Sequence, residues 1–137
     1  MDDCIFCKII AGQIPSARVH EDDTAIVFLD IDQANKGHLL IIPRYHAADF
    51  HDLDGDTAAH LGRLAWEWAG AAMNAVGSDG YNLLLSNRKE AGQEVFHTHL
   101  HIIPRWAGDG YLKGPGSSRI ADMAERQATA ALIKDAK

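Results

Sequence analysis

The sequence predicts an α+β fold, in which a five-stranded, mainly antiparallel sheet packs against one long helix and shorter terminal helices. Two observations support this fold class. Short apolar runs that suit strands follow one another with only short polar turns between them, which favours antiparallel pairing. One long segment, residues 57–76, instead has apolar residues at the 3.6-residue period of a helix.

The predicted strands are bounded by residues that favour turns. The polar run Glu21-Asp22-Asp23 separates the first two strands, Gly37 precedes the third, and prolines follow the third and the fifth. The five strands are expected at Ala17–His20, Thr24–Leu29, His38–Ile42, Tyr81–Leu85 and Val95–Ile103.

Three helices are predicted from caps and periodicity. Asp3 is expected to cap a short helix over Cys4–Ile10. Asp56 or Thr57 is expected to cap the long helix Thr57–Val76, which Gly77 ends. Its core face consists of Leu61, Leu64, Ala65, Trp68 and Ala72. Ser117 or Ser118 is expected to cap a last helix that ends near Ile133, with Ile120, Ala124, Gln127 and Ala131 on one side.

Trp66 and Met73 lie on a neighbouring face of the long helix. Ala69 and Gly70 flank this second apolar stripe, and small residues let helices approach closely. The stripe predicts either an oligomer contact or a helix that is buried on most sides.

Composition limits the class of protein. A chain of 137 residues with 47% apolar residues can form one domain with its own core. No run approaches the eighteen apolar residues of a membrane span, and the acidic start Met1-Asp2-Asp3 does not resemble a signal peptide, so a cytoplasmic protein is expected. The net charge of −6 argues against nucleic acid as a partner but permits a small phosphorylated ligand.

Three histidines alternate along the last predicted strand, at His97, His99 and His101. Alternate residues of a strand share one face, so we expect the three imidazoles to lie together. Each imidazole has two ring nitrogens that need partners, which makes three in register poor core filling. The pattern indicates either a metal cluster or a hydrogen-bonded relay around one reactive nitrogen. The other isolated histidines are expected at the surface: His20, His51 and His60.

The residues before the triad favour the relay. The run Gly92-Gln93-Glu94 leads into the strand, and a glycine-containing turn with free amide N–H groups suits an anion. A histidine Nε2 attacks phosphorus when an acceptor holds its Nδ1–H and fixes the tautomer. His99, with a histidine on either side, is therefore the predicted nucleophile.

The stretch from Gly92 to Ile103 resembles the His-φ-His-φ-His-φ-φ motif of the histidine triad (HIT) nucleotide hydrolases and transferases, in which φ is apolar. Thr98 departs mildly from it. The likeness extends to Cys4–Ile10, to Phe28–Ile31 and to Gly37-His38, and it is closest to the short nucleotide-binding branch. It implies a single domain over residues 1–137 with a HIT-like fold, a homodimer, and a purine nucleotide or nucleotide conjugate as ligand.

The resemblance also implies residue roles. His99 matches the nucleophile that forms a nucleotidyl-histidine intermediate, His101 matches its supporting histidine, and His38 joins the same hydrogen-bonded chain. Asp30 matches a carboxylate that accepts hydrogen bonds from the ribose, and Gln93 a side chain near the leaving group. The other expected nucleotide-binding residues are Ile5, Phe6, Phe28 and Ile31 around the base, with Ser86, Asn87, Glu94 and Val95. Ile9 and Ile14 match the same apolar slot, although core packing explains them equally well.

Two departures from the family pattern concern the leaving group. Glu94 stands where relatives often have a hydroxyl residue, so either its backbone N–H binds phosphate or its carboxylate engages a cationic leaving group. Ser86-Asn87-Arg88 stands where many relatives have Asn-Asn-Gly, and Ser86 replaces the Asn that contacts the phosphate.

Cys4 and Cys7 have the spacing of half a tetrahedral zinc site, and His46 and His97 are the candidates to complete it. Zinc-bearing bacterial members of the family with this Cys-Ile-Phe-Cys start are similar in that they pair the two cysteines with histidines at the positions of His46 and His97. Such a Zn²⁺ site has no open position and is structural, and catalysis needs no metal. The alternative is a redox-active cysteine pair.

The leading prediction is an enzyme that transfers a nucleotidyl group to His99 and then to water, releasing a nucleoside monophosphate. A nucleoside phosphoramidate or an aminoacyl-adenylate is the favoured substrate, and a dinucleoside polyphosphate is the alternative. Two rivals remain open: a zinc hydrolase that uses His97, His99 and His101 as metal ligands, and a nucleotide-binding module without significant activity.

Overall fold

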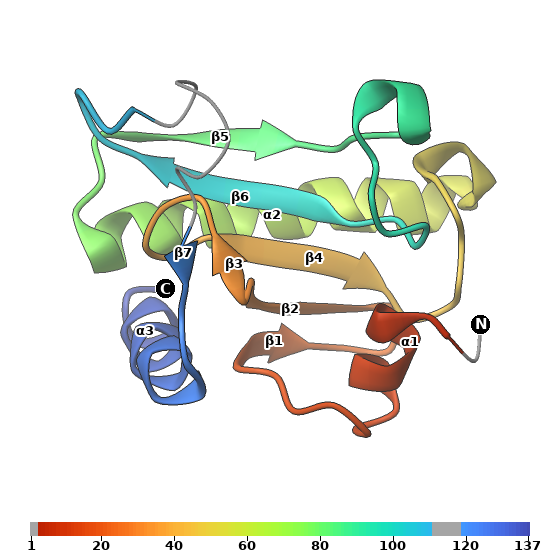
Figure 1. Ribbon diagram of the computed structural model, residues 1–137, viewed down its shortest axis with the longest axis horizontal. Coiled ribbons are helices and arrows are strands. Elements are labelled where there is room, and N and C mark those ends of the chain that lie inside the picture. Colours follow the sequence, from red (N-terminus) through yellow and green to blue (C-terminus); the bar gives the residue numbers. More distant parts are fainter. Residues whose placement is uncertain (1–2, 111–118) are drawn as a thin grey trace.

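The computed structural model describes residues 3–110 and 119–137. Five strands form one antiparallel sheet in the order β1-β2-β4-β6-β5 (Figure 1), and this confirms the predicted fold class. The strands are β1 (Arg18–Glu21), β2 (Ala25–Leu29), β4 (Leu39–Pro43), β5 (Gly80–Leu84) and β6 (Leu100–Arg105). Each lies within a few residues of its predicted position, except the start of β6.

The two faces of the sheet pack against different helices. The long helix α2 (Gly55–Val76) and α3 (Met123–Asp135) cover one face, and the short α1 (Ile5–Ile10) lies on the other (Figure 1). Alternation along β2 explains the division, since Val27 contributes to the core beneath α2 whereas Ile26 packs with α1. The central strands β2 and β4 are therefore buried on both faces, and the face beneath α1 carries the candidate site described below.

The helix ends follow from side-chain caps. Asp54, rather than Asp56 or Thr57, caps α2, because its carboxylate accepts the Thr57 N–H at 2.7 Å. Gly77 ends α2 in the left-handed conformation, as predicted. The cap of α1 is Cys4 rather than Asp3, since the Cys4 Sγ accepts the Cys7 N–H at 3.4 Å.

The prediction of a strand over Val95–Ile103 was wrong at its beginning, since β6 starts only at Leu100 and continues through Pro104. The preceding residues bond instead to the segment after β4. Thr98 donates both its N–H and its hydroxyl to the carbonyl of Ala47, at 2.8 Å and 3.0 Å. Consequently His97 and His99 lie on a bent segment before the strand, and only His101 lies within it.

The last helix also begins later than predicted. Asp122 caps α3, and its carboxylate accepts the Glu125 N–H at 2.8 Å. Ser117 and Ser118, the predicted caps, lie outside the described residues. Short elements that the sequence did not predict are a two-stranded sheet of β3 (Asp32–Gln33) and β7 (Arg119–Ile120), and the 3₁₀ turns η1 (Phe50–Asp52) and η2 (Lys89–Ala91).

The predicted core face of α2 is confirmed. All five of its residues are buried: Leu61, Leu64, Ala65, Trp68 and Ala72. Trp66 is 76% exposed, so α2 is not buried on most sides, but Ala69 belongs to the core and not to an exposed stripe. On α3 the predicted side of Ala124, Gln127 and Ala131 faces solvent, because Ala130 and Ile133 pack inward.

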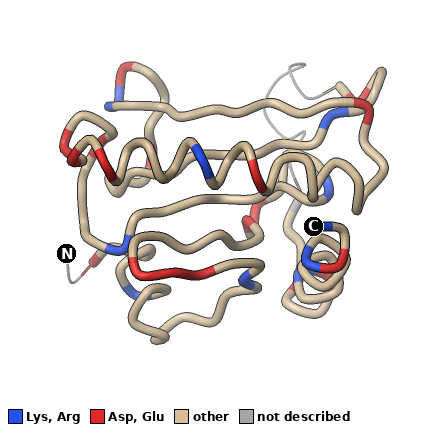
Figure 2. Tube along the Cα trace, turned by 180° about the vertical axis from the view of Figure 1, so that it is seen from behind, with Lys and Arg blue, Asp and Glu red and all other residues tan. Residues whose placement is uncertain are grey.

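Charged residues gather in the turns and on the helices, whereas β2 and β4 carry none (Figure 2). Basic and acidic residues are interspersed along the chain in this view. Among the described residues, no helix combines the length and the apolar character that crossing a membrane requires.

Candidate active site

A cavity of about 510 Å³ opens on the α1 side of the sheet. This volume lies within the usual range for small-ligand sites. Its wall is apolar on the side of α1 and β2 and polar where β4, β6 and the segment before β6 meet. The lining residues are Ile5, Phe6, Ile9, Phe28, Asp30, Ile31, Asp32, His38, Leu40, Leu84, Ser86, Gly92, Glu94, Val95, His99 and His101.

Most of the site residues predicted from the sequence meet in this cavity, although they come from distant parts of the chain. Of the residues predicted for the nucleotide site, three lie outside the cavity lining. Ile14 packs against the apolar cluster beneath α1. Asn87 accepts the Phe50 N–H at 2.8 Å, and Gln93 is 4% exposed and bonded to backbone groups. Both amide side chains therefore hold loops together.

Two histidines, His38 and His101, form a chain of hydrogen bonds whose direction the backbone fixes. Ala34 donates its N–H to His38 Nδ1 at 3.0 Å, so the proton of His38 is on Nε2. His38 Nε2 lies 2.8 Å from His101 Nδ1, which must therefore accept. The proton of His101 is consequently on Nε2, the nitrogen left to donate into the cavity.

His99 has the opposite tautomer. Its Nδ1 lies 2.8 Å from the carbonyl oxygen of His97, and a carbonyl only accepts, so Nδ1 carries the proton. The lone pair is on Nε2. The His99 ring also packs edge to face on Phe6, with centroids 5.1 Å apart, and lies 4.9 Å from the His101 ring. The neighbouring rings thus hold this unprotonated nitrogen at the cavity wall.

The three histidines that line the cavity are neutral at pH 7. Burial, followed by the charges of His101 and His99, lowers the pKa of His38 to about 3, and burial, followed by the charge of His99, lowers the pKa of His101 to about 4. Burial also lowers the pKa of His99. A neutral His99 keeps the lone pair that a nucleophile requires.

Asp30 lies at the end of β2, beside the histidine chain. Its Oδ1 accepts the Asp32 N–H at 3.0 Å, and its Oδ2 is 3.5 Å from His38 Nε2. Burial raises the pKa of Asp30 to about 6, and the charge of Asp32 acts in the same direction. The free oxygen of Asp30 is an acceptor for ligand hydroxyl groups.

The loop before the triad presents backbone donors to the cavity. Gly92, Glu94 and Val95 line it, next to His99. Among the described residues, no acceptor receives the N–H of Glu94 or of Val95. Glu94 is exposed, and Ser86 lies in the segment that follows β5, so both departures from the family pattern lie in the cavity lining.

Cys4, Cys7, His46 and His97 come together beside the cavity. One ligand atom of each lies within 4.8 Å of those of the others. His97 Nδ1 is 3.4 Å from Cys4 Sγ and 3.6 Å from Cys7 Sγ, and His46 Nδ1 is 3.4 Å from Cys7 Sγ. Burial, followed by the contact with Cys4, raises the pKa of the Cys7 thiol.

These four side chains fit a tetrahedral metal ion. His97 Nε2 lies 2.9 Å from the carbonyl of Pro43, which fixes the proton there and leaves Nδ1 as a lone pair aimed at the sulfurs. Two thiolates and two imidazoles are the donor set of structural zinc sites. Burial lowers the pKa of His97 to about 4, so it is neutral, as a ligand must be.

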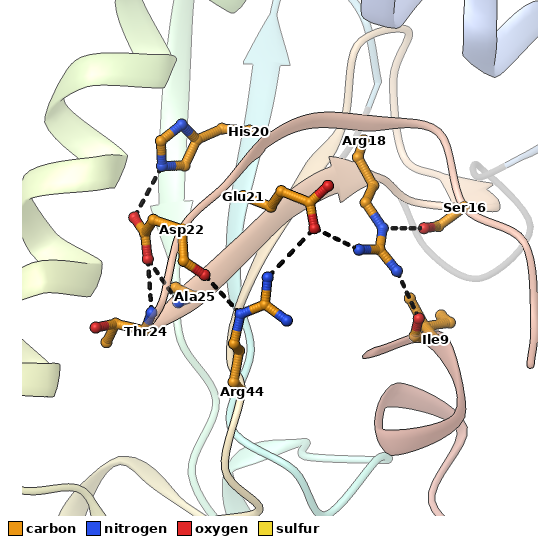
Figure 3. A network of polar contacts seen from close by, with 9 residues as sticks. All are labelled: Ile9, Ser16, Arg18, His20, Glu21, Asp22, Thr24, Ala25 and Arg44. Carbon is orange, nitrogen blue, oxygen red and sulfur yellow. Dashed lines mark hydrogen bonds and ion pairs between the residues drawn. The ribbon is translucent and has the colours of Figure 1, made fainter. Parts of the chain in front are cut away.

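The prediction that His20, His51 and His60 are surface residues holds for His51 only. His20 on β1 and His60 on α2 are half-buried, and both donate from Nε2 to the same oxygen of Asp22, at 2.8 Å and 2.7 Å. Figure 3 shows the His20 contact within the β1–β2 turn. The shared carboxylate ties this turn to α2, on the sheet face away from the cavity.

Sequence reasoning missed three residues of the lining: Asp32, Leu40 and Leu84. Leu40 was recoverable, because it lies in the predicted strand at the position opposite His101. Leu84 stands opposite His101 on the other side, a pairing that depends on the register of β5 with β6. No local pattern in the sequence gives that register.

Comparison with known proteins agrees with this geometry. Residues 11–108 match the family model described as the HIT domain. An uncharacterized HIT-like protein of Methanocaldococcus jannaschii is 41% identical over 122 residues, covering 89% of this chain and 94% of that protein. The adenosine 5'-monophosphoramidase hnt1 of Schizosaccharomyces pombe is 41% identical over 102 residues, covering 74% of each chain.

Solved structures share the fold. A HIT-like protein from Bartonella henselae superposes with a TM-score of 0.90 at 32% identity, over 100% of this chain and 98% of that one. A zinc-bound histidine triad family protein from Mycobacterium smegmatis gives a TM-score of 0.83 at 33% identity, over 98% and 93% of the two chains.

Proposed function

Because this chain belongs to the histidine triad (HIT) family, we propose that it is a nucleotide hydrolase or transferase with His99 as its nucleophile. One observation carries the proposal. The carbonyl of His97 holds the Nδ1–H of His99, and this directs the lone pair of Nε2 into a cavity that has an apolar wall and an acidic group beside it. We also propose that residues 1–137 act as a single HIT domain.

In the first step, the lone pair of His99 Nε2 forms a bond to the α-phosphorus. In a phosphoramidate, the bond from phosphorus to the leaving nitrogen breaks, and its electron pair stays on that nitrogen, which takes a proton from solvent. In an aminoacyl-adenylate, the bond from phosphorus to the acyl oxygen breaks, and the amino acid leaves as its carboxylate. Two groups stabilise the charge on the non-bridging oxygens: the backbone N–H groups of Glu94 and Val95, and the Nε2–H of His101.

In the second step, a water oxygen attacks phosphorus and loses a proton to solvent. The bond between phosphorus and His99 Nε2 breaks and returns its electron pair to the imidazole. The product is a nucleoside monophosphate, and His99 regains the neutral tautomer that the His97 carbonyl favours.

The rest of the cavity suits a nucleoside. We propose that the base lies in the apolar slot formed by Phe6, Phe28 and their neighbours, and that Asp30 accepts hydrogen bonds from the ribose hydroxyls. Among the described residues, the slot has no side-chain donor or acceptor dedicated to telling adenine from guanine. We therefore propose only a purine, on the basis of the family.

The proposed leaving group is an amine, as in a nucleoside phosphoramidate, or an amino acid that leaves as its carboxylate, as in an aminoacyl-adenylate. The similarity to an adenosine 5'-monophosphoramidase supports this choice. The exposed carboxylate of Glu94 at the rim also favours an amine or another cationic group over a second, negatively charged nucleotide. A dinucleoside polyphosphate is the alternative substrate.

We propose that Cys4, Cys7, His46 and His97 hold a structural Zn²⁺ ion, since the donor set fits and a similar protein is described as zinc-bound. The bound ion would supply a cross-link between α1 and the segment before β6. Among the described residues, His97, His99 and His101 form no common cluster, because His97 turns toward the cysteines. This geometry disfavours a zinc hydrolase built on the triad.

A substrate panel tests the proposed function. Adenosine phosphoramidate, an aminoacyl-adenylate and a dinucleoside polyphosphate are compared at equal concentration with the wild type and His99→Ala. We expect nucleoside monophosphate from the first two, and a loss of at least about 10³-fold in kcat/KM for His99→Ala. Preserved turnover in this variant, or none of the three compounds cleaved by the wild type, contradicts the proposal.

A further inference from the structure

Arg88 has a backbone conformation that ordinarily belongs to glycine. Its φ of 73° and ψ of 161° make it the one residue other than glycine with a positive φ in the described part of the chain. A residue with a side chain meets steric resistance in this region and persists there only where its surroundings enforce it. Such residues cluster at functional sites, and Arg88 begins the loop that leads to the cavity.

The peptide of Arg88 closes this loop. Its N–H donates to Gln93 Oε1 at 2.6 Å, and its carbonyl accepts the N–H groups of Ala91 and Gln93, both at 3.1 Å. The Gln93 amide then donates to the carbonyls of Ala48 at 2.6 Å and Val95 at 3.0 Å. These bonds depend on the direction in which the Arg88 peptide points, so its conformation sets the path of residues 92–95.

An ion pair holds the side chain of Arg88. Its Nε donates to Asp49 Oδ2 at 2.8 Å, and Asp49 is only 7% exposed. The other oxygen of Asp49 accepts the N–H groups of His51 and Asp52, so the carboxylate is fixed in place. Nearby, Phe50 donates its N–H to Asn87 Oδ1 at 2.8 Å. The loop therefore rests on the segment that follows β4.

The surroundings of Arg88 disfavour a direct role in binding an anion. The guanidinium faces Asp49 and is also close enough to Asp52 and Glu90 to feel their charges. An anionic leaving group at this place would face three carboxylates, and only the Arg88 guanidinium and the neighbouring Lys89 would oppose them. Arg88 is thus better suited to shaping the loop than to touching the substrate.

We propose that the Asp49–Arg88 ion pair is a positioning device for the phosphate-side loop of the cavity. It holds Arg88 in the conformation of a glycine, and the loop in turn places the N–H groups of Glu94 and Val95 beside His99. Asp49 and Arg88 are positioning residues that act through these amides. The assignment of a catalytic effect rests on the proposed function, whereas the effect on the loop does not.

Four variants test this inference: Asp49→Asn, Arg88→Gly, the double variant, and Glu21→Gln as a control. Asparagine keeps the size of Asp49 and an acceptor for the η1 amides, and glycine adopts the Arg88 conformation without help. Glu21 lies on β1, at the opposite edge of the sheet from β5, and forms exposed ion pairs with Arg18 and Arg44 (Figure 3). Each variant is measured for kcat and KM on adenosine phosphoramidate and for hydrogen exchange.

We expect Asp49→Asn to lower kcat about tenfold, the scale of one charge-assisted hydrogen bond, because the strained loop relaxes once its anchor is weakened. Arg88→Gly should stay within about threefold of wild type, and the double variant should recover most of the activity lost by Asp49→Asn. Glu21→Gln should change nothing. Rescue by glycine distinguishes positioning from a general loss of stability.

The inference is overturned if Asp49→Asn retains full activity, or if Arg88→Gly is as damaging as Asp49→Asn and the double variant shows no recovery. The second result would assign the guanidinium a direct contact. Hydrogen exchange of the peptide covering residues 92–96 gives a readout without turnover. It should quicken in Asp49→Asn and return toward wild type in the double variant, even if the proposed reaction proves wrong.

Discussion

At the scale of single residues, hydrogen-bond direction decides the chemistry of the candidate site. The backbone N–H of Ala34 and the backbone carbonyl of His97 are fixed as donor and acceptor, and between them they assign a tautomer to His38, His101 and His99. From the triad and its likeness to a family, the sequence predicts His99 as the reactive histidine, and this stays a prediction. The sequence could not predict how the protons are placed, because the two backbone contacts depend on the exact path of irregular loops and the His38–His101 bond joins residues 63 positions apart.

Asp30 gives a prediction at this scale. Burial raises its pKa from 3.8 to about 6, so the folded protein holds this proton more tightly than the unfolded chain, and stability falls as pH rises through that window. Asp30→Asn should therefore raise the free energy of unfolding of the ligand-free protein by about 1–3 kcal/mol at pH 8, with no gain near pH 3.5. Urea unfolding at both pH values measures this.

The same substitution should weaken nucleotide binding, because an amide replaces the carboxylate proposed to accept from the ribose. Calorimetric titration with AMP at pH 8 provides the matched measurement. A variant that is no more stable than wild type at pH 8 would show that burial of the Asp30 carboxylate does not destabilise the protein. A variant that binds AMP as tightly as wild type would show that Asp30 is not part of the nucleotide site.

At the scale of elements, local patterns predicted the strands and helices, and tertiary contacts decided where several of them begin. The core strands β2 and β4 and the inner face of α2 follow directly from apolar period. The start of β6 does not, since Thr98 bonds to Ala47, which lies far away in sequence. The apolar wall of the cavity follows from the same apolar runs as the strands. Gln93 and Asn87, which the sequence also predicts at the nucleotide, lie outside the cavity lining and bond to neighbouring loops.

The proposed zinc site yields a prediction for α1. Phe6 lies between the two cysteines in sequence and packs edge to face on both His97 and His99, with centroids 5.8 Å and 5.1 Å apart. Loss of the metal should therefore loosen α1 and the base slot together. We expect chelation to lower the melting temperature, speed hydrogen exchange across residues 5–10, and weaken AMP binding about tenfold or more.

The double variant Cys4→Ser/Cys7→Ser serves as the control for chelation. It should purify without zinc, resemble the chelated wild type in stability and AMP affinity, and show no response to chelator. Equal AMP affinity in the zinc-loaded and zinc-free forms would separate the metal site from the cavity and refute the coupling.

At the scale of the whole molecule, the sheet ends in an exposed apolar edge. β5 is the last strand in the sheet order, and Tyr81, Leu83 and Leu84 are 43%, 48% and 42% exposed. Trp66 on α2 is 76% exposed. An unpaired apolar edge of this kind suits pairing with another chain, and we propose a homodimer through β5 and α2. Because Leu84 also lines the cavity, such a contact would border the candidate site.

Trp66→Glu combined with Leu83→Lys tests the dimer, since both charges would be placed in the proposed contact. Light scattering should give a mass of twice 15.0 kDa for the wild type and 15.0 kDa for the variant. A monomeric wild type would rule out the dimer. A variant that remains dimeric would place the contact elsewhere.

The central claim is that His99 becomes covalently bonded to the α-phosphorus. The most direct test mixes the protein with adenosine phosphoramidate labelled at that phosphorus and quenches the reaction in milliseconds under conditions that preserve phosphorus–nitrogen bonds. We predict protein-bound label that rises in a burst, maps to His99 by peptide sequencing, and is absent from His99→Ala. Turnover of the substrate without any protein-bound label, or label on another residue, would contradict the account.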